Sequence, residues 1–180
     1  MCGLVGYKSK NNIFFNKLKL VESINHRGPD SKKYFEIKKK GSIKNNIFLG
    51  FARLSIIDEN KRSDQPFRYK NLILCFNGEV YNYKLLRAEL IKEKKVKFKT
   101  NSDTEVLIKL IYYSGLQKAL EKIEGMWAFS LYNTTNENLI VCRDRFGEKP
   151  LLYFKDSNNF FFGSELPAFQ IFLKKNFKVN

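Results

Sequence analysis

The sequence predicts an α+β fold, because strand-like and helix-like segments come in blocks rather than in strict alternation. Short apolar runs with strand character stand at both ends of the chain, and two helix-like segments follow one another in its middle. A chain of 180 residues, 43% of them hydrophobic, is long enough to bury the core of one globular domain. Seventeen Phe and nine Tyr supply much of the apolar surface for that core.

The first half of the chain is expected to form strands around one helix. From Phe14 the spacing of Leu18, Val21 and Ile24 is helical, and the turn residues at positions 26–30 end that helix. The expected strands are Cys2–Tyr7, Tyr34–Ile37, Asn46–Ile57 with a bend near Arg53, and the buried run Leu72–Phe76, with a turn at Gly41 and a polar loop over Asp58–Pro66.

The second half is expected to begin with two helices and to continue in strands. Leu85, Leu86 and Leu90 have helical spacing. The run Ser102-Asp103-Thr104-Glu105 matches a capping box that opens a helix, and Gly115 is expected to close it. The expected elements are a helix over Tyr83–Glu93, a helix from Ser102 to Gly115, strands over Met126–Tyr132, Leu139–Arg143, Leu151–Phe154 and Phe160–Phe162, hairpin turns over Asn133–Asn138 and Asp156–Asn159, and a last helix over Glu165–Phe172.

The chain is strongly basic, with a formal net charge of +15. Such a charge is typical either of proteins that bind nucleic acid or of a lysine-rich solvated surface. We expect the second and no nucleic-acid partner, because the charge is spread along the chain and no nucleic-acid motif accompanies it. In the densest stretch, Lys92–Lys99, Val96 and Phe98 alternate with lysines. This pattern predicts a strand with one buried face and one face guarded by lysine.

Cysteine usage and hydropathy indicate a cytoplasmic protein. Cys2, Cys75 and Cys142 are odd in number and far apart, and His26 is the single histidine, so we expect free thiols and no metal site. No apolar run approaches the roughly 20 residues that a membrane-spanning helix needs. The N-terminus lacks the pattern of a secretory signal, and we expect no membrane association.

Cys2 is the first candidate for chemistry, because removal of Met1 would leave a thiol and a free α-amino group on one residue. An α-amino group has a pKa of about 7.7–8.0, so near neutral pH it is partly unprotonated and can take the proton of the thiol. Nucleophile and base then belong to the same residue, as in N-terminal nucleophiles. The alternative is a small apolar side chain at the start of a strand.

Asn77-Gly78 follows a buried strand and has two interpretations. Asn-Gly is the commonest dipeptide of tight hairpin turns. The same pair can also form an oxyanion hole, because a side-chain amide and a glycine N–H can converge on one developing negative charge. The sequence alone leaves both open.

Three further charged residues have both structural and functional interpretations. Arg53 lies in an apolar stretch, where it must pair with Asp58 or another carboxylate, or bind the carboxylate of a small ligand. Asp103 at a helix start is favoured by the helix dipole. His26 could be the partner of a Cys–His pair, but we expect a loop-stabilising role, since an N-terminal cysteine brings its own base.

Nine segments carry a resemblance that runs in order over nearly the whole chain, and although each alone is weak, the ordered set is specific. They are Cys2-Gly3, His26-Arg27-Gly28-Pro29-Asp30, Ala52-Arg53-Leu54-Ser55-Ile56-Ile57-Asp58, Gln65-Pro66, Phe76-Asn77-Gly78-Glu79-Val80-Tyr81-Asn82, Ser102-Asp103-Thr104-Glu105-Val106, Gly125-Met126-Trp127-Ala128-Phe129, Arg143-Asp144-Arg145-Phe146-Gly147-Glu148-Lys149-Pro150 and Ser164-Glu165-Leu166. Together they resemble the class II glutamine amidotransferase domain of asparagine synthetase. The Arg-Leu-Ser-Ile-Ile-Asp segment favours that branch over the hexosamine and purine amidotransferases.

The resemblance implies a four-layer αββα sandwich of two antiparallel sheets, of the N-terminal-nucleophile hydrolase type, over residues 2–180. It implies that Cys2 attacks the side-chain amide of L-glutamine, giving glutamate and ammonia for asparagine synthesis through a thioester. The roles so implied are oxyanion binding by Asn77 and Gly78, binding of the α-carboxylate by Arg53 and of the α-ammonium by Asp103, and contact with the substrate by Leu54, Ile56, Ile57 and Glu79.

The family joins this domain to a synthetase domain that activates aspartate with ATP and Mg²⁺. The Ser-Gly-Gly-x-Asp-Ser loop of that domain is not found here, the chain ends before the family's last glutaminase strands, and Pro167 stands where the family has lysine. We therefore expect a glutaminase domain that is truncated at its C-terminal end, needs no cofactor of its own and passes ammonia to a synthetase domain or subunit. The alternative is a non-catalytic truncated domain that acts as an interaction module.

Overall fold

The computed structural model describes residues 2–13, 16–41 and 43–174 of the chain. Its strands are β1 Gly3–Ser9, β2 Ser31–Ile37, β3 Asn46–Arg53, β4 Phe67–Tyr69, β5 Leu72–Val80, β6 Gly125–Asn133, β7 Asn138–Arg143, β8 Leu152–Lys155 and β9 Asn159–Gly163. Its α-helices are α1 Lys17–Glu22, α2 Tyr83–Lys94, α3 Asp103–Ser114, α4 Leu116–Lys122 and α5 Leu166–Leu173, and short 3₁₀ turns cover Asn25–Arg27 and Lys61–Ser63.

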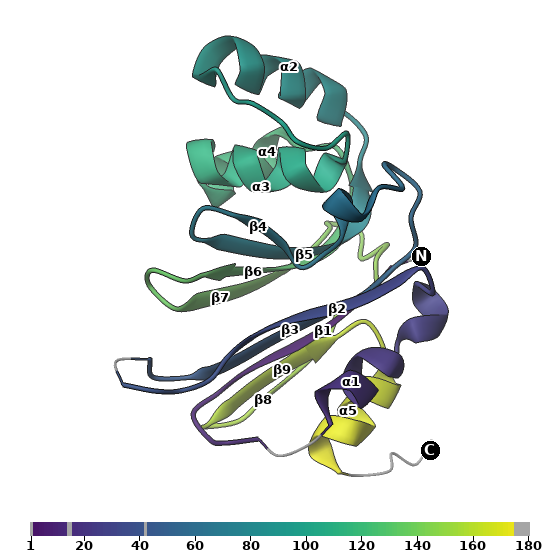
Figure 1. The fold of residues 1–180 in the computed structure, drawn as a ribbon, viewed down its shortest axis with the longest axis vertical. Coiled ribbons are helices and arrows are strands. Elements are labelled where there is room, and N and C mark those ends of the chain that lie inside the picture. Colours follow the sequence, from purple (N-terminus) through teal and green to yellow (C-terminus); the bar gives the residue numbers. More distant parts are fainter. Residues whose placement is uncertain (1, 14–15, 42, 175–180) are drawn as a thin grey trace.

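These elements form four layers (Figure 1). Helices α3 and α4 cover the outer face of one sheet, with α2 packed against α3 on the side away from the sheet, and helices α1 and α5 cover the outer face of the other. The two sheets face each other in the middle of the molecule. This arrangement confirms the α+β class and the αββα sandwich that the resemblance implied.

Both sheets are antiparallel. The five-stranded sheet has the order β2-β3-β1-β9-β8, and the four-stranded sheet has the order β4-β5-β6-β7. In the first, Val5 of β1 lies opposite Gly50 of β3 and Gly163 of β9. Strand β1 is thus the central strand of its sheet. Cys2 immediately precedes this strand.

The inner faces of the two sheets form a continuous apolar core. Leu4, Leu49 and Phe51 from the first sheet pack with Ile73 and Tyr132 from the second, and all five are at most 1% exposed. Because helices cover the outer faces as well, the central strands are buried on both sides. This explains why β1 and β3 are nearly continuous apolar runs instead of alternating ones.

Most predicted elements are present, with shifted ends. The first helix begins at Lys17, and Phe14 and Phe15, at its expected start, lie outside the described residues. Strand β3 ends at Arg53, four residues before the expected end at Ile57, and β5 continues through Asn77-Gly78 to Val80. The hairpin predictions are confirmed, because β6 pairs with β7 and β8 pairs with β9 in antiparallel register.

The strand expected within Lys92–Lys99 is wrong. Helix α2 continues to Lys94, Lys95 ends it with a left-handed φ of 54°, and the following residues form a loop. Val96 is buried in the core that the helices form with the four-stranded sheet, and Phe98 packs against that core. The alternation therefore arises from a loop that covers the helical layer with two apolar side chains.

The capping box is only half present. The Ser102 hydroxyl accepts a hydrogen bond from the Thr104 N–H, as expected for an N-cap. The Glu105 carboxylate instead accepts from the Lys99 N–H, the Thr100 N–H and the Thr100 hydroxyl. The loop before the helix folds back over its first turn and offers these three donors, which draws Glu105 away from Ser102. Strand β4 and helix α4 were not predicted.

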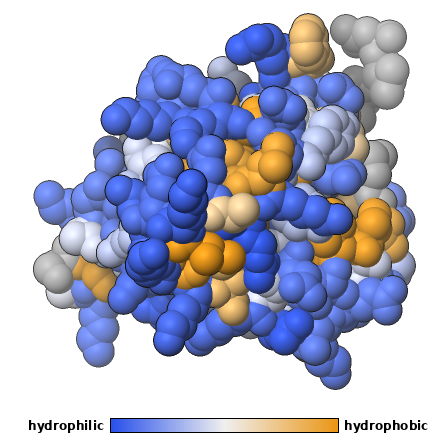
Figure 2. Space-filling model, turned by 90° about the horizontal axis from the view of Figure 1, so that it is seen from above, coloured by the Kyte–Doolittle hydropathy of each residue, from blue (hydrophilic) through white to orange (hydrophobic). Residues whose placement is uncertain are grey.

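Hydrophilic residues cover most of the face shown in Figure 2, with hydrophobic residues near its centre and at its right-hand edge. This agrees with a solvated surface rich in lysine, and the absence of a nucleic-acid partner stays a prediction. Among the described helices, none combines the length and the hydrophobicity that crossing a bilayer requires.

A buried ion pair anchors the loop that precedes α3. Lys109 donates to Glu105 at 2.6 Å, and their side chains are 3% and 2% exposed. The Lys109 ammonium also lies over the ring of Phe98, 4.4 Å from its centroid. Since Glu105 holds the backbone of residues 99 and 100, the pair fixes the approach of the chain to Ser102.

Removal of Glu105 is expected to destabilise the fold strongly. Glu105→Ala should lower the free energy of unfolding by about 3–5 kcal/mol, because it leaves the Lys109 charge buried without its partner. The double variant Glu105→Leu/Lys109→Met should recover part of that loss. Urea unfolding followed by circular dichroism measures the effect. As a control, Glu89→Ala removes a pair that is about half exposed and should cost less than about 1 kcal/mol. Equal stability of the Glu105→Ala and Glu89→Ala variants would contradict this interpretation.

Candidate functional site

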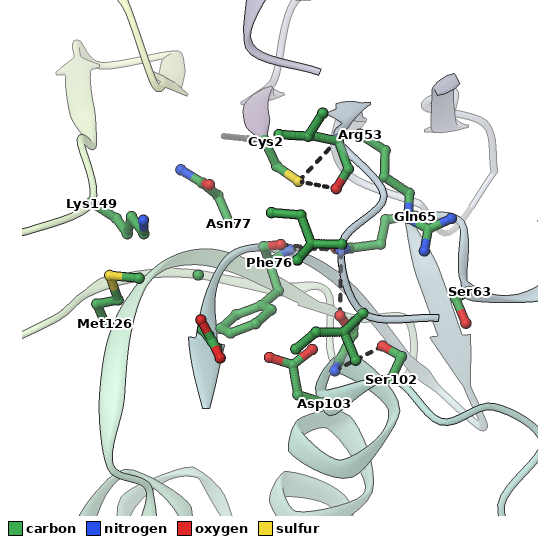
Figure 3. A pocket seen from close by; sticks show the side chains of 16 residues that line it. Cys2, Arg53, Ser63, Gln65, Phe76, Asn77, Ser102, Asp103, Met126 and Lys149 are labelled. Carbon is green, nitrogen blue, oxygen red and sulfur yellow. Dashed lines mark hydrogen bonds between the residues drawn. The ribbon is translucent and has the colours of Figure 1, made fainter. Parts of the chain in front are cut away.

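A cavity of about 100 Å³ lies beside Cys2, between the ends of the two sheets and the first turn of α3 (Figure 3). Its wall includes all nine residues that the sequence marked for catalysis or substrate binding. They are Cys2, Arg53, Leu54, Ile56, Ile57, Asn77, Gly78, Glu79 and Asp103. The fold therefore gathers residues from β3, β5 and α3, and from the segments that flank β1 and β3, at one place.

Cys2 stands immediately before β1, with its thiol at the cavity wall. Its Sγ lies 3.3 Å from the backbone N and 3.4 Å from the backbone O of Leu54. The Arg27 guanidinium donates to the Cys2 carbonyl oxygen at 2.9 Å and so fixes the backbone on the other side. Burial raises the pKa of the Cys2 thiol, although the Leu54 N–H acts in the opposite direction. A base that takes the thiol proton is therefore needed for nucleophilic chemistry near neutral pH.

Asn77 and Gly78 lie inside β5, opposite Ala128 and Trp127 of β6, and not in a hairpin turn. The turn interpretation is therefore wrong. The Asn77 side chain is 2% exposed, and its Nδ2 finds no hydrogen-bond partner among the described residues. A buried amide without a partner costs about 1–3 kcal/mol, so the Asn77 Nδ2 in the cavity wall is a candidate donor to a ligand.

Gly78 has a structural reason to be glycine as well. A Cβ at this position would lie 2.2 Å from the carbonyl oxygen of Met126. Backbone of the neighbouring strand thus fills the space where a side chain would stand. Gly78 also lines the cavity, where its backbone can face a substrate.

Arg53 is the last residue of β3 and only 5% exposed. Its Nη1 donates to the Asp64 carboxylate at 2.9 Å, and its Nη2 donates to the Asp58 carbonyl oxygen at 2.5 Å. Asp64 is its ionic partner, and Asp58 contributes only backbone. Burial acts to raise the pKa of Asp64, but hydrogen bonds from Lys33 and Arg53 outweigh it and hold that pKa below its usual value. The described residues offer no acceptor for the Arg53 Nε, which keeps one donor for a ligand.

Asp103 is the first residue of α3 and is 5% exposed. Its carboxylate accepts from the Val80 N–H at 3.0 Å. Burial raises its pKa to about 6, and the negative charge of Glu79 acts in the same direction. A carboxylate held in this way gains from a cationic ligand group, which would replace the lost solvation.

The remaining expected residues complete the wall. Leu54, Ile56 and Ile57 follow Arg53 in the segment that leaves β3, and Ile56 is 74% exposed. Glu79 follows Gly78 in β5. The cavity therefore places an apolar stretch beside two opposite charges and a thiol.

Seven further residues line the cavity and were not assigned to it from the sequence: Ser63, Gln65, Phe76, Ser102, Thr104, Met126 and Lys149. Gln65 is the most connected of them. Its carbonyl accepts from the Phe76 N–H at 2.6 Å, and its amide donates to the Phe76 carbonyl oxygen at 3.1 Å and to the Thr104 hydroxyl at 3.4 Å. Lys149 adds a second cation and is 7% exposed. Both stand in quoted motifs, but the surrounding turn residues indicated only loops.

His26 does not line the cavity. Its Nε2 lies 2.7 Å from the Glu165 carboxylate, which also accepts from the Arg27 guanidinium at 2.6 Å. These contacts tie the loop after α1 to the start of α5, in agreement with the expected loop-stabilising role. The described residues contain no group of three or more His, Cys, Asp or Glu side chains that could hold a metal ion.

The arrangement suits acyl transfer from a small zwitterionic molecule. A thiol, an unpaired amide donor and the backbone of Gly78 share the cavity wall, as nucleophilic attack on a carbonyl requires. Arg53 and Asp103 bring opposite charges, which match a carboxylate and an ammonium group.

Comparison with known proteins identifies relatives over the whole chain. A family model described as "Glutamine amidotransferase domain" matches residues 1–180. Asparagine synthetase [glutamine-hydrolyzing] 1 of Bacillus subtilis (strain 168) is 38% identical over 179 residues, which are 95% of this chain and 27% of that protein. Putative asparagine synthetase [glutamine-hydrolyzing] 2 of Methanocaldococcus jannaschii is 32% identical over 203 residues, covering 100% of this chain and 37% of that protein. The chain thus spans about a quarter to a little over a third of the length of these relatives.

Solved structures share the fold at lower sequence identity. The glutamine phosphoribosylpyrophosphate amidotransferase from B. subtilis, complexed with ADP and GMP, superposes with a TM-score of 0.71 at 22% identity, over 94% of this chain and 43% of that one. A structure described as the allosteric regulatory enzyme of purine biosynthesis gives a TM-score of 0.74 at 23% identity, with the same two coverages. The fold, the cavity beside Cys2 and the family match over residues 1–180 agree, and the chain belongs to the class II glutamine amidotransferase domain family.

Proposed function

We propose that this chain hydrolyses L-glutamine to L-glutamate and ammonia through a thioester on Cys2, and that the ammonia serves asparagine synthesis. The observation that carries the proposal is the cavity in which Cys2 lies with the unpaired Asn77 amide, Arg53 and Asp103. Membership of the glutamine amidotransferase family and the names of the relatives support the choice of substrate and product.

The proposed substrate fits the charges of the cavity. Arg53, with its Nε free and two nitrogens already held, binds the α-carboxylate of glutamine. Asp103 binds the α-ammonium group. Leu54, Ile56, Ile57 and Glu79 contact the substrate between the two charged groups and the reacting amide.

The first half of the proposed reaction forms the thioester. With Met1 removed, the α-amino group of Cys2 takes the proton of the thiol, and the thiolate attacks the amide carbon of the glutamine side chain. The negative charge that develops on oxygen is stabilised by the Asn77 amide and the Gly78 N–H, each such donor being worth about 2.7–4 kcal/mol. The protonated α-amino group then gives its proton to the leaving nitrogen, and ammonia departs.

The second half releases glutamate. The α-amino group takes a proton from water, which attacks the thioester carbon, and the thiol is restored as glutamate leaves. These steps need no cofactor, because nucleophile, base and oxyanion donors all belong to the chain. We propose that a synthetase domain or subunit, which uses ATP and Mg²⁺, accepts the ammonia. The three free cysteines support a reducing, cytoplasmic setting.

Cys2→Ala is expected to reduce ammonia release from L-glutamine by about a thousandfold or more, because the covalent route is lost. The fold should be unchanged, since alanine fits a small half-buried position. A coupled glutamate dehydrogenase assay with intact mass on the same sample measures both turnover and removal of Met1. Cys142→Ala removes another half-buried thiol, outside the cavity, and should keep full activity. Unchanged turnover by the Cys2→Ala variant would refute the mechanism.

Arg53→Ala is expected to raise the KM for L-glutamine by about 10- to 100-fold with a smaller change in kcat, because one charge-assisted contact is lost. Asp64 keeps Lys33 as a partner at 2.9 Å, so the variant should fold. Lys33→Met is the matched control, since it removes the other partner of Asp64 and leaves Arg53 in place. A normal KM in the Arg53→Ala variant would show that Arg53 is only a structural member of this ion pair.

Glutamine binding is expected to weaken below about pH 6, because Asp103 must be ionised to attract an ammonium group and its pKa is raised to about 6. KM measured from about pH 8 down to about pH 5 should rise in the acidic range. In Asp103→Asn the KM should be high throughout and should lose this dependence.

The same raised pKa has a consequence for stability. Between the unfolded pKa near 3.8 and the folded pKa of about 6, the folded chain binds more protons, so the free energy of unfolding falls as pH rises through this window. Asp103→Asn should therefore raise that free energy by about 1–3 kcal/mol near pH 8 and give no such gain below about pH 4. Stabilisation equal at both pH values would contradict the assignment.

A further inference from the structure

The two charged residues that face the cavity come from different layers of the fold. Arg53 ends β3 of the five-stranded sheet, and Asp103 begins α3, which covers the four-stranded sheet. A ligand that carries a carboxylate and an ammonium group on one carbon needs both partners at a fixed separation. A misplacement of about 1 Å can cost about 100-fold in rate, so some contact must hold these layers in register.

Asp58 makes that connection with three of its atoms. Its carbonyl oxygen accepts from Nη2 of Arg53 at 2.5 Å. Its Oδ2 accepts from the N–H of Asn101 at 2.7 Å, two residues before Asp103. Its Oδ1 accepts from the N–H of Asn60 at 3.2 Å, which holds the local turn. One residue thus joins the guanidinium of one charged site to the backbone that leads into the other.

Asp58 lies in the loop that follows β3, and its contacts hold its side chain in place. Its side chain is 5% exposed, and its backbone has a left-handed φ of 57°. A non-glycine residue with such a φ is uncommon and needs support from its surroundings, although aspartate and asparagine tolerate it better than most. Asp58 does not line the cavity, so it acts through Arg53 and Asn101 and does not touch a substrate.

A second link joins the same two segments but is weaker. Gln65, seven residues after Asp58, donates to the Thr104 hydroxyl at 3.4 Å. The contact from Asn101 to the Asp58 carboxylate is shorter and is assisted by charge, which makes it the stronger tie. Among these two polar links, the one through Asp58 therefore does more to set the position of Asp103 relative to Arg53.

We propose that Asp58 is a positioning residue that fixes the separation of Arg53 and Asp103, and through it the selectivity of the cavity for an α-amino acid head group. The inference rests on the proposed function for the roles of Arg53 and Asp103. Loss of the Asp58 carboxylate leaves the side chains of Arg53 and Asp103 present. The distance between them is then no longer fixed. Binding of a ligand that uses both should suffer, while the thiol and its immediate surroundings stay the same.

Two variants with graded effects test this inference. Asp58→Gly removes both side-chain acceptors and suits the left-handed φ, and Asp58→Asn keeps one oxygen acceptor and also tolerates that φ. Asp156→Asn is the matched control, because Asp156 likewise accepts from two backbone N–H groups, those of Asn158 at 2.8 Å and Asn159 at 2.7 Å. It lies in the β8–β9 turn, at the end of β1 that is opposite to Cys2.

The readouts are steady-state ammonia release and alkylation of Cys2 by iodoacetamide, with and without L-glutamate and followed by peptide mass spectrometry. We expect Asp58→Gly to raise the KM for L-glutamine about tenfold while kcat stays within about threefold, with a smaller rise in Asp58→Asn. Protection of Cys2 by L-glutamate should weaken by a similar factor, and alkylation without ligand should not change. Asp156→Asn should match the wild type in every readout.

The outcomes separate this inference from the proposed function. A lower folded fraction alone would reduce kcat and leave KM unchanged, so that pattern, or wild-type KM and protection in folded Asp58→Gly, would overturn the role of Asp58. If the wild type turns over glutamine and Arg53→Ala raises KM, the proposed function stands whatever Asp58 does. A wild-type chain without turnover and without protection by L-glutamate would overturn the proposed function, and the inference with it.

Discussion

The packing of β1 against β5 is the contact on which the candidate site depends. Leu4 of β1 and Cys75 of β5 are fully buried in the core between the two sheets. Cys2 stands two residues before Leu4, and Asn77 stands two residues after Cys75. Because side chains alternate along a strand, residues two apart share a face, so the apolar contact also turns the thiol and the amide toward the same space. The hydrophobic core thus sets the geometry of the polar site without any direct bond between Cys2 and Asn77.

The site contains several groups that the fold alone does not favour. Asn77 keeps a buried amide without a partner, and Asp103 keeps a buried carboxylate whose charged form is poorly solvated. Neither improves the packing of the empty protein. Such unfavourable groups gather at functional sites because a ligand, and not the protein, supplies their missing partners. In the same molecule the charges of Glu105 and Lys109 are fully paired, which marks them as structural.

Local patterns predicted much of the fold, and their failures have identifiable causes. Apolar runs indicated β1, β3 and β5 because these strands are buried on both faces. The alternation of apolar and lysine residues in Lys92–Lys99 wrongly predicted a strand. A loop that packs on the helices can also bury every second side chain, without pairing to a strand. Strand β4, with three residues, is too short to leave a pattern, and its position depends on its pairing with β5. Glu105 does not complete the capping box because N–H and hydroxyl donors of the preceding loop bind its carboxylate. The capping-box pattern covers only four residues and so does not include that loop.

For the candidate site, residue chemistry could suggest roles but not proximity. The Asn77-Gly78 pair remained ambiguous until its pairing with β6 excluded a turn. Arg53 required a carboxylate, and the sequence offered Asp58 first, yet the structure gives the ionic contact to Asp64 and only the backbone of Asp58. Gln65 and Lys149 were hidden in apparent loops. Only the ordered resemblance grouped the nine expected residues, because their common cavity arises from contacts between distant segments.

Gly78 carries a consequence for how this domain can vary. Its missing side chain lets the neighbouring strand approach closely, since a Cβ would lie 2.2 Å from the Met126 carbonyl oxygen. A substitution at Gly78 would therefore destabilise the fold, and the cell would degrade the misfolded chain. The amount of protein would fall before the activity of the folded protein could be measured. Substitutions at Cys2 or Asp103 would leave abundance intact or raise it. A survey of cellular protein levels would therefore rank Gly78 as indispensable and overlook the residues that bind and react.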